Sequence, residues 1–138
     1  MSMLYLDNDV LAKFARPNPD PVVVEYLQGR HAEPWGISSL VAYEFLSFYP
    51  QSQRGEKLRQ LEQDVLNEIS PIDTRTSLQA ATLRSLLENA GTALDTGDLF
   101  VAATVRRHGG TLATANANDF DKQPIHELLD VEIVPTDA

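Results

Sequence analysis

Short apolar runs alternate with segments of helical periodicity along this 138-residue chain. The first apolar run, Met3–Leu6, precedes a polar turn and a helical segment, and similar short runs return at intervals after it. Strands that alternate with helices predict a parallel sheet with helices packed on its faces. In such sheets ligands bind at the carboxyl ends of the strands, so the residues that follow each strand are the first candidates for a functional site.

Apolar spacing, prolines, glycines and capping residues set the expected elements within a single domain over residues 1–138. We expect strands over residues 4–6, 35–38, 68–72, 111–113 and 131–134. We expect helices over residues 8–15, 21–29, 39–49, 55–67, 74–89 and 96–108. Trp35, Phe45 and Phe48 are expected in the core.

The charge balance is strongly acidic, with 20 acidic and 11 basic residues and a formal net charge of −9. Such a field repels nucleic acid at long range, so a nucleic-acid substrate would require bound metal, a local arginine patch or high salt. A lysine-poor acidic surface is consistent with a halophilic source or with an ordinary acidic protein. The lack of cysteine excludes disulfides and thiolate nucleophiles. Without a signal peptide or an apolar run of membrane-spanning length, we expect a cytoplasmic protein with no membrane partner.

Four acidic residues occupy positions whose neighbours are expected to be buried: Asp7, Glu44, Asp98 and Asp119. Asp7 and Asp119 follow strand-like runs, whereas Glu44 and Asp98 lie on the apolar faces of two helices. Burying a carboxylate is costly unless a cation compensates it, so acids without a nearby basic partner indicate a divalent metal site. Each acid also has a structural alternative: a helix cap at Asp7, a solvent-exposed helix edge at Glu44, a helix dipole at Asp98 and a plain turn at Asp119.

Further polar residues near these acids are candidates for orienting them. Asp9 and Asp95 could lie in the surroundings of the site, although the helix dipole and helix capping also explain them. Thr114 and Asn116 supply neutral oxygens just beyond the strand that precedes Asp119. Oxygen ligands without cysteine or paired histidines suit Mg²⁺ or Mn²⁺ better than zinc.

Four motifs, in order along the chain, resemble those of PIN-domain nucleases, and especially of the VapC-type toxins of prokaryotic toxin–antitoxin pairs. They are Leu6–Leu11, Ser38-Ser39 leading to Glu44-Phe45, Gly97–Ala103, and Leu112–Phe120. The resemblance implies a Rossmann-like three-layer α/β/α fold with a short central parallel sheet. It also implies a metal-dependent endoribonuclease that cleaves RNA, a cognate antitoxin and a homodimer.

Carried over by position, the resemblance makes Asp7, Glu44 and Asp98 the core metal-binding and catalytic acids. Asp119 becomes the fourth, with Thr114 and Asn116 shaping that corner of the site. The first motif departs from the Asp-Thr-Asn of many members, because this chain has Asp7-Asn8-Asp9. The core acid is kept, so the departure affects the hydrogen bonding around it rather than the expected activity.

Three alternative functions remain open at this point. The chain could be a PIN-fold RNA-processing nuclease instead of a toxin, or a PIN scaffold that binds without cleaving. A phosphatase of the haloacid dehalogenase type would use Asp7 as a nucleophile. That enzyme class requires a lysine after a later strand, and Lys13, Lys57 and Lys122 do not fit its pattern.

Overall fold

The computed structural model describes residues 2–137, which form a five-stranded sheet with the strand order β3-β2-β1-β4-β5. Every neighbouring pair of strands is parallel, and Tyr5 lies opposite both Gly36 and Leu112. The strands are β1 (Leu4–Leu6), β2 (Trp35–Ser38), β3 (Glu68–Ser70), β4 (Thr111–Thr114) and β5 (Asp130–Ile133). The predicted parallel sheet is confirmed.

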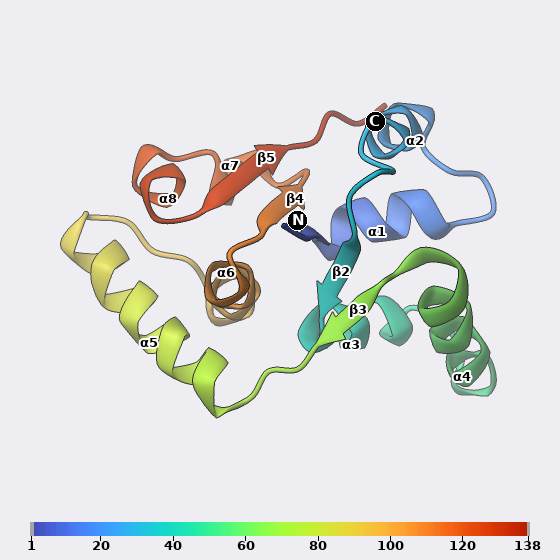
Figure 1. The fold of residues 1–138 in the computed structure, drawn as a ribbon, viewed down its shortest axis with the longest axis horizontal. Coiled ribbons are helices and arrows are strands. Elements are labelled where there is room, and N and C mark those ends of the chain that lie inside the picture. The colour runs from blue at the N-terminus through green and yellow to red at the C-terminus, as the bar shows by residue number, and fades with distance from the viewer. Residues whose placement is uncertain (1, 138) are drawn as a thin grey trace.

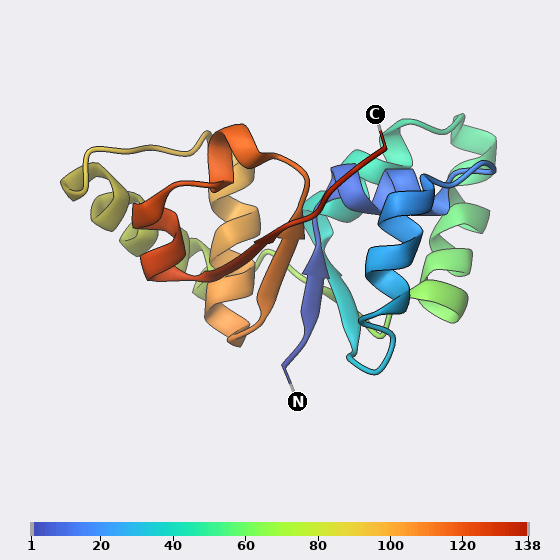
Figure 2. The same cartoon turned by 90° about the horizontal axis from the view of Figure 1, so that it is seen from above.

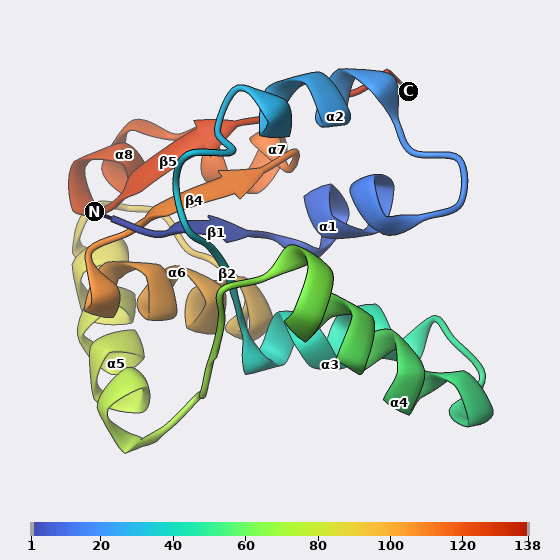
Figure 3. The same ribbon diagram turned by 45° about the vertical axis from the view of Figure 1, so that its right-hand side comes forward.

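Helices cover both faces of the sheet, so the predicted three-layer arrangement is also confirmed. Figure 1 shows α5 and α6 on one side of the strands and α1, α2 and α4 on the other, while α3 and α4 run side by side in Figure 3. The helices are α1 (Asn8–Ala15), α2 (Pro21–Gln28), α3 (Ser39–Ser47), α4 (Gln51–Gln60), α5 (Thr74–Asn89), α6 (Thr96–His108), α7 (Ala117–Phe120) and α8 (Gln123–Leu128), with a π-helical turn at Leu61–Val65.

The core lies where the central strands meet the helices. Leu4, Ile37 and Leu112 from three adjacent strands are fully buried, and Leu83 of α5 is buried with them. The close approach of β1 and β4 depends on Gly110, because an added Cβ there would lie 2.6 Å from the carbonyl oxygen of Met3. This close contact lies at the centre of the sheet, where β1 and β4 begin side by side.

Short polar side chains end the central strands and begin the helices that follow them. Asp7 accepts a hydrogen bond from the Asn8 N–H at the start of α1, and Ser38 accepts one from the Val41 N–H in α3. Such caps satisfy amide groups that the first helical turn leaves unpaired. They also bring polar side chains to the carboxyl edge of the sheet, the upper edge in Figure 2.

Several expected element bounds differ from the structure. The helix expected over residues 55–67 begins earlier, at Gln51 after Pro50, and changes to the π-helical turn at Leu61. Its start was missed because α4 buries none of its residues and therefore lacks an apolar stripe. The short helices α7 and α8 were not predicted. Phe48 is not in the core: its exposed fraction is 77%.

Among residues 2–137, no helix has both the length and the apolar character that crossing a membrane requires.

Candidate functional site

Asp7 is a buried carboxylate at the carboxyl end of the central strand β1, with an exposed fraction of 8%. Its Oδ2 accepts a hydrogen bond of 2.8 Å from the Thr114 hydroxyl, and its Oδ1 accepts one of 2.9 Å from the Asn8 N–H. Burial, and then the negative charge of Asp9, raises the pKa of Asp7 to about 6 despite these hydrogen bonds. Asp7 is therefore both the helix cap and a carboxylate that is costly to ionise.

Asp9 lies in the first turn of α1 and contacts the residue that follows β4. Its Oδ1 accepts a hydrogen bond of 3.2 Å from the Ala115 N–H. Burial raises the pKa of Asp9, and the nearby charge of Lys13 opposes that rise only in part. The Ala115 amide is a contact that side-chain patterns could not reveal, since it belongs to the backbone.

Glu44 on α3 and Asp98 on α6 lie close enough to Asp9 and Asp7 to feel their charges. Burial, and then the charges of Asp95, Asp7 and Asp119, raises the pKa of Asp98 to about 7. Burial raises the pKa of Glu44 as well, with the charges of Asp95 and Asp9 adding to it. These mutual effects place the acids of four separate elements within electrostatic reach of one another. We call Asp7, Asp9, Glu44, Asp95, Asp98 and Asp119 the acid cluster.

Asp95 and Asp119 form hydrogen bonds with backbone N–H groups or with neighbouring side-chain amides. Asp95 caps α6 by accepting a hydrogen bond of 2.9 Å from the Asp98 N–H. Asp119 accepts one of 2.9 Å from the Asn116 side-chain amide, and the Asn116 Oδ1 accepts one from the Asp119 N–H. Thr114 joins this corner to Asp7, because its oxygen accepts from the Asn116 N–H while its hydroxyl donates to Asp7. All eight residues singled out in the sequence thus lie at one edge of the sheet.

Ion pairs are absent from the acid cluster in the described part of the chain. Within residues 2–137, none of the ion pairs includes Asp7, Asp9, Glu44, Asp98 or Asp119. Carboxylates that raise one another's pKa favour either a proton or a cation between them. Oxygen ligands alone suit a hard divalent ion such as Mg²⁺ or Mn²⁺. In the described part of the chain no three acidic or histidine side chains are already close enough together to hold an ion. The donor set therefore fits a divalent ion in its chemistry, and its side chains are not yet arranged around one.

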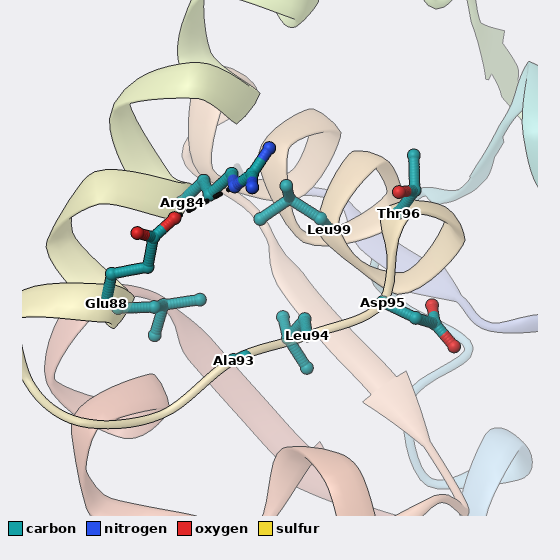
Figure 4. Close-up of a pocket in the computed structure, with 8 residues that line it drawn as sticks. Arg84, Glu88, Ala93, Leu94, Asp95, Thr96 and Leu99 are labelled. Carbon is teal, nitrogen blue, oxygen red and sulfur yellow. Dashed lines mark hydrogen bonds and ion pairs between the residues drawn. The ribbon is translucent and has the colours of Figure 1, made fainter.

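A cavity of about 480 Å³ adjoins the acid cluster at Asp95, where α5 ends and α6 begins. Figure 4 shows Arg84 and Glu88 side by side on α5, and Asp95 at the start of α6 with its carboxylate directed away from them. Sequence reasoning missed Arg84, because its spacing from Glu88 reads as an ordinary surface ion pair. The lining residues are Arg84, Leu87, Glu88, Ala93, Leu94, Asp95, Thr96 and Leu99.

Comparisons with known proteins agree with this architecture. Toxin FitB of Neisseria gonorrhoeae is 28% identical over 126 residues, which cover 86% of this chain and 91% of that protein. The VapC ribonuclease Y4jK of Sinorhizobium fredii is 25% identical over 127 residues, with the same coverage of 86% and 91%. The crystal structure of FitAcB from Neisseria gonorrhoeae superposes with a TM-score of 0.74 at 25% identity, covering 94% of this chain and 96% of that one.

The family model of the PIN domain matches residues 4–125, from the first strand to the last helix before β5. That span contains every member of the acid cluster. The resemblance found in the four sequence motifs is thereby confirmed over most of the chain, and so is the expected fold class. This chain belongs to the PIN-domain family.

Proposed function

We propose that this chain is a metal-dependent endoribonuclease and the toxin of a toxin–antitoxin pair. The observation that carries the proposal is the acid cluster: carboxylates from the end of β1, from α3 and from α6 that share one edge of the sheet and form no ion pair among the described residues. The relatives support it, since one is named a VapC ribonuclease and another a toxin. The expected RNA substrate, cognate antitoxin and homodimer belong to the same proposal.

Asp7, Glu44, Asp98 and Asp119 are the residues that would hold Mg²⁺ or Mn²⁺. Such an ion, when bound, lowers the pKa of a water molecule and offsets the charge of the phosphate. The chain's other residues set the positions of these acids: Thr114 fixes one oxygen of Asp7, and the Ala115 N–H fixes one oxygen of Asp9. Asp95 fixes the first turn of α6, from which Asp98 projects.

Cleavage of a labelled RNA in Mg²⁺ or Mn²⁺, followed with and without a chelator, tests the activity. We expect Asp98→Asn to lower the cleavage rate about 100-fold or more, because several kcal/mol of charge stabilisation depend on the metal site. Asp64→Asn is the matched control, since Asp64 is an exposed acid in the π-helical turn outside the cluster. Equal cleavage by wild type and Asp98→Asn would contradict the assignment, and metal-independent binding without cleavage would indicate a binding module.

A growth assay separates a toxin from an RNA-processing enzyme. Induced expression of a toxin arrests growth, and co-expression of a small protein encoded beside it restores growth. Exposed apolar side chains on α3 and directly after it support a protein-binding face, since Tyr43 is 68% exposed and Phe48 77% exposed. Light scattering of the chain alone measures self-association. The same measurement with the small protein encoded beside it detects a complex.

A further inference from the structure

The cavity at the junction of α5 and α6 combines features that the acid cluster lacks. It holds the cation Arg84 at one side, reaches Asp95 at the other and has leucine side chains in its wall (Figure 4). Asp95 belongs to the acid cluster and accepts a hydrogen bond from the N–H of Asp98, another of its members. An RNA strand whose cleaved phosphate lies at the acids would therefore pass next to this cavity. The inference rests on the proposed function for that placement.

Charge makes Arg84 the natural partner of a phosphate near the site. The chain carries a net charge of −9, and the acids repel the RNA backbone. Two arginines on α6 are engaged elsewhere: Arg106 binds the Leu128 carbonyl and Gln79, and Arg107 binds Asp73. Arg84 is the cation among the residues that line the cavity. A second hollow of about 470 Å³ along α5 is also lined by Arg84, so this side chain stands between the two.

Breaking the ion pair between Arg84 and Glu88 costs little free energy. Its Nε lies 2.9 Å from Glu88 Oε1, and the two side chains are 73% and 59% exposed. Exposed pairs four residues apart on a helix contribute little to stability, because water screens them. A phosphate, like a carboxylate, offers two acceptor oxygens to a guanidinium group. It can therefore replace Glu88 as the partner of Arg84.

Leu94 is the partly exposed leucine of the cavity lining, and it offers an apolar contact to a base. Leu87 and Leu99 are almost fully buried beneath the cavity, and Leu94 borders it from the loop between α5 and α6. Unpaired bases of single-stranded RNA bind by apolar contact and by stacking on arginine side chains. We infer that this cavity binds one nucleotide of single-stranded RNA beside the cleaved bond, with its phosphate on Arg84 and its base against Leu94.

Binding of a fluorescent single-stranded RNA, measured by anisotropy in chelator over a range of salt concentrations, tests the phosphate contact. We expect Arg84→Gln to weaken binding about threefold to tenfold and to lower the salt slope by about 0.7. Glu88→Gln releases Arg84 and is expected to tighten binding. The matched control is Arg59→Gln, which makes the same charge change in the exposed Arg59–Glu56 pair on α4.

Opposite effects of the two cavity variants are the signature of the site. If Arg84→Gln and Arg59→Gln weaken binding equally, only the net charge matters and the inference fails. If Glu88→Gln weakens binding as Arg84→Gln does, the pair is structural and the inference also fails. Thermal unfolding of each variant verifies that the fold is retained.

The base contact has its own test. We expect a fully abasic strand to bind wild type more weakly than the matched RNA, and we expect Leu94→Ala to reduce that difference. Equal affinity for the two strands would overturn the base contact. Cleavage separates the two proposals: if wild type cleaves RNA but Arg84→Gln has unchanged KM and affinity, this inference alone fails. If wild type binds with the expected pattern and does not cleave in Mn²⁺, the proposed function alone fails.

Discussion

The acidic residues at the two ends of α6 have opposite surroundings. At its last turn, Arg107 pairs with Asp73 at 2.6 Å, and this arginine together with the Thr76 N–H lowers the pKa of Asp73. At its first turn, Asp98 meets only other acids, and burial with their charges raises its pKa to about 7. A paired acid stabilises the fold, whereas the unpaired acid cluster costs stability until something cationic joins it. The contrast sets a carboxylate that has an ion-pair partner against one that does not.

The largest expected effect is the stabilisation of the acid cluster by metal. At about 100 times its dissociation constant, Mn²⁺ should raise the free energy of unfolding by about 2.7 kcal/mol, because only the folded chain assembles the site. Urea unfolding with and without Mn²⁺ measures this. Asp98→Asn should lose most of the gain and Asp64→Asn should keep it. An undiminished gain in Asp98→Asn would place the ion elsewhere.

Neutralising a buried acid of the cluster should stabilise the metal-free chain. We expect Asp7→Asn to raise the free energy of unfolding by about 1–2 kcal/mol near pH 8, where the wild-type carboxylate is ionised at a cost. The new side-chain amide can donate to the Thr114 oxygen, and its oxygen still accepts from the Asn8 N–H, so the cap survives. Urea unfolding in chelator gives the sign directly, and a loss of stability would contradict the unpaired state of Asp7.

Acidification should act in the same direction as that substitution, because it neutralises the same kind of buried carboxylate. The pKa values of Asp7 and Asp98 rise to about 6 and about 7, so the folded chain binds protons that the unfolded chain releases. The stabilisation is complete below the unfolded pKa and is lost as the pH rises through these folded values. Metal-free stability should therefore increase from about pH 8 to about pH 5. The expectation would be contradicted if the free energy of unfolding of wild type did not change with pH. It would also be contradicted if Asp98→Asn showed the same pH dependence as wild type.

The smallest effect is expected at the paired end of α6, and it has the opposite sign. Asp73→Asn keeps a good helix cap for α5 but removes the charge that Arg107 binds. We expect the Tm to fall by about 1–3 °C, since exposed ion pairs contribute modestly. Calorimetry in chelator, next to Asp7→Asn, compares the same chemical change at the two sites. Stabilisation by both variants would remove the distinction between them.

Much of the fold was predictable because the strands are short, apolar and separated by capped helices. Phe48 shows the limit: its spacing from Phe45 suits a buried face, yet α3 buries Val41, Ala42 and Phe45 and leaves Phe48 in solvent. Periodicity identifies an apolar stripe, but it does not say how wide a strip the neighbouring helices cover. Tertiary packing alone decides that.

The residues of the candidate site were predictable from the sequence, but the relative burial of its acids was not. Sequence reasoning put most of the physical argument on Glu44 and Asp98, because their helix faces looked apolar. In the structure Asp7 is the most buried of the three, while Glu44 is only partly buried. The reason lies in the position of β1 at the centre of the sheet, which encloses whatever follows it. The metal-binding roles of these acids stay a prediction.

The hydrogen bond between Thr114 and Asp7 joins residues 107 positions apart in the sequence. Asp7 leaves the ribosome early in synthesis, whereas β4, which supplies Thr114, follows only after most of the chain has been made. Contacts between distant segments form late, because the intervening chain must first be ordered. A nascent or truncated chain that ends before β4 therefore cannot complete the acid cluster. Any activity that needs the whole acid cluster therefore depends on the segment from β4 to Asp119 having been made and folded against β1.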